Sequence, residues 1–369
     1  MVKVMKRVYR SWKKIGREVH FLATGEGNPR NGEGAFIRLA NGDILFAYTA
    51  YFGDDYHDHC TANICVCTSS DEGEHWSDPR VAIPMPDDAM NVMSVSLLRM
   101  QNGDVGMFYL KKEAYRGDVI TRYLLSRSSD EGKTWGEPTS CIEDTDYYVV
   151  NNDRVIRLFD GRLLFSAAVH PIGKAKEGNE AVSIAKAHFF ISEDDGKSFY
   201  DAGVELSSPV KNDTTGLQEP GVYQMDDGTV WAYFRTRLGC QYASYSHDGG
   251  KSWSDPQPDF RFTSPRSPMK VARVGKMTVS IFNPVPEHAG NRLPFGMDRT
   301  PFMLAVSEDG GQTFSSSYLL EDDLNNCYCY PAVIEGEDYF LVAYYHSNNT
   351  EQFLNCTKIV KVAFSELTE

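Results

Sequence analysis

The stretch Ser128-Ser129-Asp130-Glu131-Gly132-Lys133-Thr134-Trp135 has the composition of a tight turn between two β-strands. An aspartate side chain can accept hydrogen bonds from backbone N–H groups two or three residues further on, which closes such a turn. Gly132 supplies a backbone angle that other residues resist, and Trp135 is large enough to hold the turn against a small sheet. The stretch therefore predicts a turn that is stabilised by its own side chains.

The same pattern, Ser-x-Asp-x-Gly-x-(Thr/Ser/His)-(Trp/Phe), occurs five times, and we call each copy a box. Successive box aspartates are 59, 64, 54 and 61 residues apart. A regular spacing of this kind is typical of proteins in which one supersecondary unit is repeated. The five boxes occupy residues 69–76, 128–135, 192–199, 246–253 and 307–314.

A second motif, a polar tight turn between two alternating apolar runs, precedes each box. An Asn-Gly or Asp-Gly pair in that setting is the strongest short signal for a β-hairpin. The four clear copies span residues 35–46, 97–105, 155–164 and 222–231, and two degenerate copies span 269–281 and 331–342.

Six hairpins and five boxes leave the last unit, which ends in the apolar run 358–364, without a box. An N-terminal strand over residues 18–23 would complete it by closing a ring. The sequence therefore predicts an all-β protein, a six-bladed β-propeller with about four antiparallel strands per blade.

Composition narrows the class of protein. The 369 residues are expected to form a single propeller domain, with residues 1–16 as a peripheral N-terminal extension. Hydrophobic residues make up 41% of the chain, enough for a substantial core, and the net charge of −14 argues against a nucleic-acid partner.

The sequence also gives expectations about cellular location and cofactors. The chain contains no stretch resembling a signal peptide or a transmembrane segment. We therefore expect a cytoplasmic protein with no membrane partner, or a secreted one if a leader has been removed. The eight cysteines lack the C-x-x-C spacing of metal or redox sites, so we expect reduced core thiols, no metal and no cofactor. The oligomeric state is not indicated.

Ligands of propellers bind where the inner strands converge, at one end of the central channel. Polar residues recur at that end of successive hairpins, and although each alone is more typical of a solvated loop, their repeated placement favours a site. They are Asp58, His59, Asn151, Asn152, Asp153, Arg154, Gln218, Glu219, Arg235, Arg237, Arg266, Arg299, Tyr328 and Tyr330.

The boxes, the hairpin order and several of these residues resemble the sialidase (neuraminidase) superfamily over residues 33–364. In that superfamily a glutamate precedes the fourth-blade hairpin turn and an arginine ends the following strand, positions held here by Glu219 and Arg235. A second family arginine stands eight residues before the serine of the fifth box, where this chain has Arg299.

The resemblance also implies a nucleophile and an acid. The family's nucleophilic tyrosine precedes the sixth-blade hairpin, where Tyr328 fits without a gap and Tyr330 is the alternative. Two residues apart in a strand, both are expected to face the channel. The acid/base aspartate of the family lies in the long loop before the first box, where Asp58 falls in register.

The chain departs from the family in the first blade. Sialidases carry an Arg-Ile-Pro-like motif there, whose arginine completes a three-arginine clamp on the substrate carboxylate, but this chain has Gly32-Glu33-Gly34. Arg30 could reach in from a neighbouring turn, or Arg154, Arg237 or Arg266 could compensate from another blade. Alternatively, the sugar is not sialic acid.

The residue types suit one another chemically. A sugar with a carboxylate on its anomeric carbon would repel an anionic nucleophile, whereas a tyrosine stays neutral until a glutamate draws off its proton. The resemblance thus implies a hydrolase that releases a terminal sialic acid or related sugar from a glycan. Two alternatives stay open: Asp58, Glu219 and Asp153 acting on a different sugar, and a non-catalytic propeller that binds glycan or protein.

Overall fold

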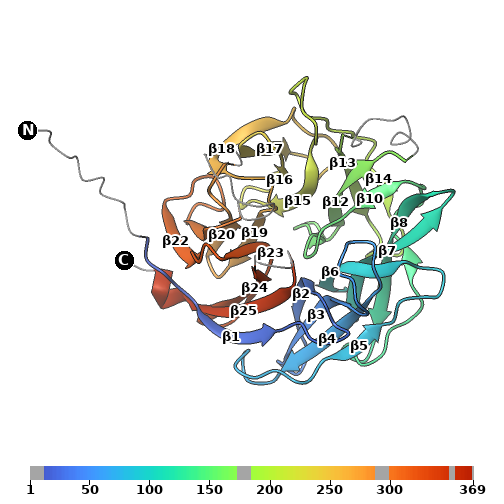
Figure 1. The fold of residues 1–369 in the computed structure, drawn as a ribbon. Coiled ribbons are helices and arrows are strands. Elements are labelled where there is room, and N and C mark those ends of the chain that lie inside the picture. Colours follow the sequence, from blue (N-terminus) through green and yellow to red (C-terminus); the bar gives the residue numbers. More distant parts are fainter. Residues whose placement is uncertain (1–11, 173–183, 287–298, 349–353, 368–369) are drawn as a thin grey trace, which may run out of the picture.

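The computed structural model describes residues 12–172, 184–286, 299–348 and 354–367. In these residues the chain forms six antiparallel sheets arranged around a central axis (Figure 1), with one short 3₁₀ helix, η1 (Phe364–Leu367), and no α-helix. The predicted six-bladed β-propeller is confirmed. None of the described residues forms a helix with the length and apolar character needed to cross a membrane.

Each of the first three blades places its inner strand next to the channel. Blade 1 consists of β2 (Asn31–Arg38), β3 (Ile44–Tyr51), β4 (Ala62–Ser69) and β5 (Arg80–Ile83). Blade 2 consists of β6 (Asn91–Arg99), β7 (Val105–Tyr115), β8 (Asp118–Ser128) and β9 (Thr139–Ser140). In blade 3, β10 (Tyr147–Val149) and β11 (Ile156–Arg157) both pair with β12 (Leu163–His170), followed by β13 (Lys186–Ser192) and β14 (Tyr200–Asp201).

Blades 4 to 6 repeat the arrangement. Blade 4 consists of β15 (Gln218–Gln224), β16 (Val230–Arg235), β17 (Cys240–Ser246) and β18 (Gln257–Thr263). Blade 5 consists of β19 (Lys270–Val274), β20 (Met277–Phe282), β21 (Phe302–Ser307) and β22 (Ser316–Glu321). Blade 6 contains β23 (Asn326–Glu335), β24 (Tyr339–Asn348) and β25 (Cys356–Ala363).

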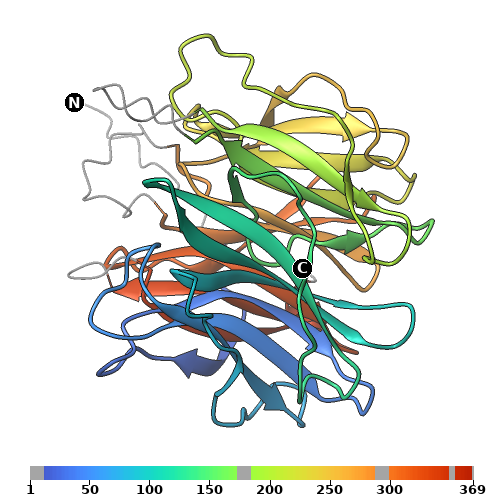
Figure 2. The same cartoon turned by 90° about the vertical axis from the view of Figure 1, so that its right-hand side faces the viewer.

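The N-terminal strand β1 (Arg17–Leu22) is the fourth strand of blade 6 and pairs antiparallel with β25. In the register of this pair Arg17 lies opposite Lys361, and Leu22 lies opposite Thr357. The start of the chain thus completes the last blade, as the missing sixth box indicated. Seen from the side (Figure 2), the blue first blade lies next to the red sixth blade.

The core lies between the faces of neighbouring blades. The described buried residues fall into six main clusters, one for each pair of adjacent sheets. The cluster between blades 6 and 1, which joins Leu341 and Ile359 to Phe36 and Phe46, closes the ring. The central strands are buried on both faces, as in β3 and β12, where six and seven consecutive residues are buried, so every blade contributes to two interfaces.

The boxes form side-chain-fastened turns, with one correction of spacing. Asp130 Oδ1 accepts the backbone N–H of Thr134 at 2.9 Å, four residues on rather than the expected two or three. Ser128 Oγ accepts the N–H of Gly132 at 2.7 Å, and Gly132 has a φ of 80°. The same aspartate–N–H bond recurs in the other four boxes, with His75, Ser198, Ser252 and Thr313 as donors.

Candidate active site

One local device positions the side chains at the mouth of the channel. In five blades a non-glycine residue at the start of the inner strand adopts a left-handed conformation with φ between 44° and 60°. In four of them it lies at a shift in strand register, so an extra residue is inserted and its side chain turns toward the channel. Such strained residues concentrate at functional sites. The five residues with this left-handed conformation are Glu33, Ser94, Asp153, Glu219 and Tyr330.

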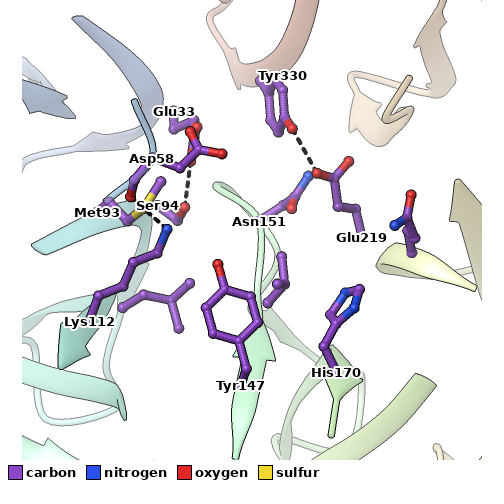
Figure 3. A pocket seen from close by; sticks show the side chains of 13 residues that line it. Glu33, Asp58, Met93, Ser94, Lys112, Tyr147, Asn151, His170, Glu219 and Tyr330 are labelled. Atoms are coloured by element: carbon purple, nitrogen blue, oxygen red, sulfur yellow. Dashed lines mark hydrogen bonds between the residues drawn. The ribbon is translucent and has the colours of Figure 1, made fainter. Parts of the chain in front are cut away.

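Tyr330 and Glu219 meet across the channel from blades 6 and 4. The Tyr330 hydroxyl donates a hydrogen bond of 2.7 Å to Glu219 Oε1 (Figure 3). Arg235, at the end of β16, forms an ion pair with the other oxygen of Glu219, and its Nη1 lies 3.4 Å from the Tyr330 hydroxyl. The three residues form one hydrogen-bonded unit.

The charges around this unit set which group holds the proton. Burial opposes ionisation of Glu219, but Arg235, the Tyr330 hydroxyl and Arg299 together hold the pKa of Glu219 below its ordinary value. Burial and the neighbouring Glu219 raise the pKa of Tyr330 well above its ordinary value, against the opposing effect of Arg235 and Arg299. At neutral pH the tyrosine therefore keeps its proton and points it at an ionised carboxylate.

The expectation that Tyr328 also faces the channel is wrong. Tyr328 is fully buried in the cluster between blades 5 and 6, where its ring packs near Phe302 and Tyr344. The two tyrosines would share a face in a regular strand, but the register of β23 shifts between Cys329 and Ala332. Because Tyr330 adopts a φ of 56° in that bulge, its side chain alone reaches the channel.

An arginine-rich cavity of about 360 Å³ opens beside Tyr330. Arg299 is held there by its contacts with Cys329 Sγ and the Arg266 carbonyl, both at 3.0 Å, and its guanidinium lies 5.7 Å from the Tyr330 ring centre. The cavity wall carries four guanidinium groups and two carboxylates, an excess of positive charge in an acidic chain. Its described lining residues are Arg30, Tyr56, His57, Asp58, Glu219, Arg235, Arg266, Arg299, Tyr330 and Leu354.

A second cavity of about 190 Å³ lies on the other side of the same residues. It shares Asp58, Glu219 and Tyr330 with the arginine-rich cavity, so these three side chains stand where the two meet. Lys112 Nζ donates to the Asp58 carbonyl at 2.7 Å and secures the loop that carries Asp58. The remaining described lining residues are Glu33, Met93, Ser94, Leu110, Lys112, Tyr147, Val149, Asn151, His170 and Gln218.

Arg30 reaches the site but is fully engaged by the protein. Its guanidinium binds Glu33 Oε1 at 2.8 Å and Asp58 Oδ1 at 2.6 Å, and its Nε donates to the Tyr345 hydroxyl at 2.8 Å. The side chain is only 2% exposed and lies over the ring of Tyr51. Arg30 is therefore shared by two carboxyl groups, and we call Arg30, Glu33 and Asp58 the acidic cluster.

Three of the expected binding residues lie elsewhere. Arg154 is buried, and its guanidinium donates to the Tyr233 hydroxyl at 2.9 Å and to the Met269 carbonyl at 2.7 Å. Asp153 forms an ion pair of 2.7 Å with Lys270. Within the described chain neither residue lines the two cavities, and Arg237 does not line them either. Arg154 joins blade 3 to blades 4 and 5, and Asp153 joins blade 3 to Lys270 of blade 5, which corrects their expected role in binding.

Several lining residues were missed from the sequence. Glu33 was identified only as part of the segment that lacks the family arginine. Ser94, Lys112 and Tyr147 were not predicted as site residues. A signal was present, because Glu33 and Ser94 each stand nine residues before the turn glycine of their hairpin, as Glu219 does. In the described chain no group of three or more His, Cys, Asp or Glu side chains is assembled to hold a metal, and all eight cysteines have free thiols.

Residues 48–343 match the family described as BNR repeat-like domain. No curated protein matches the chain.

Similar solved structures share the fold at low identity. A protein of unknown function from Dyadobacter fermentans is 18% identical, with a TM-score of 0.71, over 94% of this chain and 99% of that one. The NanB sialidase of Streptococcus pneumoniae is 12% identical, with a TM-score of 0.70, over 96% and 71%. The intramolecular trans-sialidase of Ruminococcus gnavus is 14% identical, with a TM-score of 0.69, over 95% and 98%.

Proposed function

The chain belongs to the BNR repeat-like family within the sialidase propeller superfamily, and from that premise we propose that it is a glycoside hydrolase. It releases a terminal acidic sugar, of the sialic acid type, from a glycan. The observation that carries the proposal is the hydrogen bond between Tyr330 and Glu219 at the junction of two cavities.

Tyr330 acts as the nucleophile and Glu219 as its base. The phenol is neutral at rest, so it can approach an anomeric carbon that bears a carboxylate without charge repulsion. As its oxygen attacks, the proton passes along the 2.7 Å hydrogen bond to Glu219. Arg235 lies against both groups and stabilises the negative charge that forms on the tyrosine oxygen.

The arginine-rich cavity supports an anionic substrate group. Arg235, Arg266 and Arg299 line it from blades 4 and 5, and planar guanidinium groups bind carboxylates by paired charge-assisted hydrogen bonds. Because the surrounding chain has a net charge of −14, this local excess of positive charge is a property of the cavity. Arg266 takes the place of the first-blade arginine in the clamp.

Protonation of the leaving oxygen falls to the acidic cluster on the blade 1 side. Asp58, to which the resemblance assigns this role, lines both cavities. Burial raises the pKa of Asp58, but Arg30 and Lys112 outweigh this and hold the pKa well below its ordinary value. A second carboxylate, Glu33, stands within the same cluster.

The test is release of 4-methylumbelliferone from its α-sialoside. We expect turnover by the wild type, loss of turnover in Tyr330→Phe, and near wild-type rates in the matched control Tyr328→Phe, whose ring lies in the core. Equal activity of the wild type and Tyr330→Phe would refute the nucleophile. Tight binding of sialosides without any turnover would point to a glycan-binding propeller.

A second candidate is a glycosidase for a different sugar. It is favoured by two observations. Glu33 stands in the blade where sialidases carry their first clamp arginine, and the charge of Arg30 is offset by two carboxyl groups. A panel of aryl glycosides that includes α-sialosides, uronides and neutral hexosides separates the candidates. Turnover of a neutral hexoside but not of the sialoside would select the second.

A further inference from the structure

The acidic cluster contains two carboxyl groups but only one guanidinium. Arg30 lies between Glu33 and Asp58, with 2.8 Å and 2.6 Å contacts, so two carboxylates share one guanidinium. Both Arg30 and Glu33 are almost completely buried, whereas the Asp58 side chain is 60% exposed. Two carboxylates in such proximity resist ionising together, and the one that is less solvated retains a proton more readily.

Glu33 is that carboxylate. Its Oε2 lies 2.5 Å from Ser94 Oγ, and its Oε1 contacts Arg30. Burial raises the pKa of Glu33 above its ordinary value, and Asp58 raises it further, which Arg30, Ser94 and Lys112 only partly offset. Other ionisable groups also face the cluster: His59 acts on Asp58, and Cys60 interacts with Arg30. The hydroxyls of Tyr51, Tyr330 and Tyr345 face it as well.

Glu33 lies where its proton can reach a bound substrate. Glu33 lines the second cavity together with Asp58, Glu219 and Tyr330. Figure 3 shows Glu33 and Asp58 on one side of this cavity, with the hydrogen-bonded pair of Tyr330 and Glu219 across from them. A nucleophile on one side and an acid on the other is the arrangement that displacement of a leaving group requires.

We propose that Glu33 donates the proton to the leaving oxygen, and that Asp58 is a positioning residue that acts on Glu33 through their shared Arg30. This inference rests on the proposed function and identifies its acid. It assigns a catalytic role to the residue that stands in the first blade in place of the family arginine.

Tyr330 Oη bonds to the anomeric carbon and passes its proton to Glu219, while the glycosidic C–O bond breaks and the leaving oxygen takes the proton of Glu33. Glu33, now ionised, then accepts a proton from a water molecule whose oxygen attacks the anomeric carbon. The bond to Tyr330 breaks, and its oxygen regains the proton from Glu219, which restores the enzyme.

Leaving-group dependence tests the assignment. Glu33→Gln and Asp58→Asn are compared on 3′-sialyllactose, whose leaving alcohol needs a proton, and on 4-methylumbelliferyl α-sialoside, whose leaving phenol needs little assistance. We expect Glu33→Gln to lower kcat/KM for sialyllactose by about 10²–10⁴-fold and for the aryl sialoside far less. Asp58→Asn should change both substrates by a similar factor and should move the limb of the pH–rate profile that reports the acid to lower pH.

The opposite pattern overturns the inference: selective loss on sialyllactose in Asp58→Asn, with both substrates affected equally in Glu33→Gln. A wild type that hydrolyses neither substrate would instead refute the proposed function, and the inference with it.

Carboxyl ¹³C NMR of glutamate-labelled protein provides a readout that does not depend on turnover, with Glu33→Gln assigning the signal. Glu33 should titrate above the ordinary glutamate range of about 4.3, and its midpoint should fall in Asp58→Asn. A midpoint at or below that range would overturn the inference.

Discussion

At the scale of single residues, left-handed backbone conformations decide which side chains reach the channel. Glu219 and Tyr330, with φ of 44° and 56°, belong to different blades but occupy the same place in their inner strands. Each non-glycine residue in this region costs about 1–3 kcal/mol. Packing of the surrounding sheets offsets this strain. As a result Tyr330 and Glu219 form a hydrogen bond that regular strands would not allow.

Arg266 provides a prediction at this scale. Because Arg266 lines the arginine-rich cavity and Arg237 does not, Arg266→Ala should raise KM for 4-methylumbelliferyl α-sialoside by roughly tenfold or more, with a smaller effect on kcat. The matched control Arg237→Ala should keep KM near the wild-type value. Steady-state kinetics on both variants decide the matter. An unchanged KM in Arg266→Ala would mean that Arg266 does not bind the substrate carboxylate.

At the scale of elements, the inner strand β2 is built around the acidic cluster. A Cβ on Gly32 would lie 2.0 Å from the ring of Tyr345, and one on Gly34 would lie 2.4 Å from Phe46. The glycines on either side of Glu33 thus permit close approach of strands and side chains. Tyr345 in turn accepts the hydrogen bond from Arg30 Nε, so the packing of β2 and the charge balance of the site are linked.

Gly32→Ala tests this link. The added methyl group should displace Tyr345, lower the free energy of unfolding by about 1–3 kcal/mol and reduce activity through a loosened Arg30. Urea denaturation and the pH–rate profile measure the two effects. Gly25→Ala is the control, because a Cβ there meets nothing within 4 Å. Unchanged stability in Gly32→Ala would mean that Tyr345 has room to move.

At the scale of the whole molecule, buried polar contacts hold the blades together below the site. Arg154 extends from blade 3 to Tyr233 in blade 4 and to the Met269 carbonyl at the start of blade 5. Arg154→Met should therefore lower the free energy of unfolding by about 2–5 kcal/mol, since hydrogen bonds to charged groups are each worth about 1.5–3 kcal/mol. Denaturant unfolding measures this loss, whereas KM of the folded protein should stay near wild type. A large rise in KM would instead mean that Arg154 contributes to substrate binding.

The five boxes predict how the propeller responds to acid. Hydrogen bonds within the turns lower the pKa of Asp309 to about 2, and for Asp248 they outweigh burial and give the same value. These values lie below the unfolded value of about 3.9, so the stabilisation is complete above about pH 4 and is lost as the pH falls toward 2. Melting temperatures measured from pH 7 to pH 2 should fall in that window, and less steeply in Asp248→Asn. A melting temperature that is flat below pH 4 would contradict this.

Most of the fold and part of the site could be predicted from residue patterns. The boxes and hairpin turns are local, since their glycines and aspartates fasten a turn wherever it occurs, and their spacing predicts six blades. Glu219, Arg235, Arg299 and Asp58 were predicted because the resemblance to sialidases places family residues at these positions relative to the boxes and hairpins. Tyr328 was misplaced because alternation was assumed to continue through the bulge in β23. Arg154, Asp153 and Arg237 were expected in the site because they stand at the ends of hairpins, a position that does not by itself decide whether a side chain lines the cavities.

The sequence by itself determined the repeat, the ring closed by an N-terminal strand and the residue types of the site, because these depend on short-range turn chemistry and on the period of apolar residues. Only the tertiary structure decided that Tyr330 faces Glu219, that Arg30 is shared by Glu33 and Asp58, and that Arg154 holds blades together. These outcomes depend on bulges that reverse side-chain direction and on contacts between distant parts of the chain, such as Tyr330 with Glu219 and Arg154 with Met269, which are more than a hundred positions apart. They arise only when the blades converge around one channel.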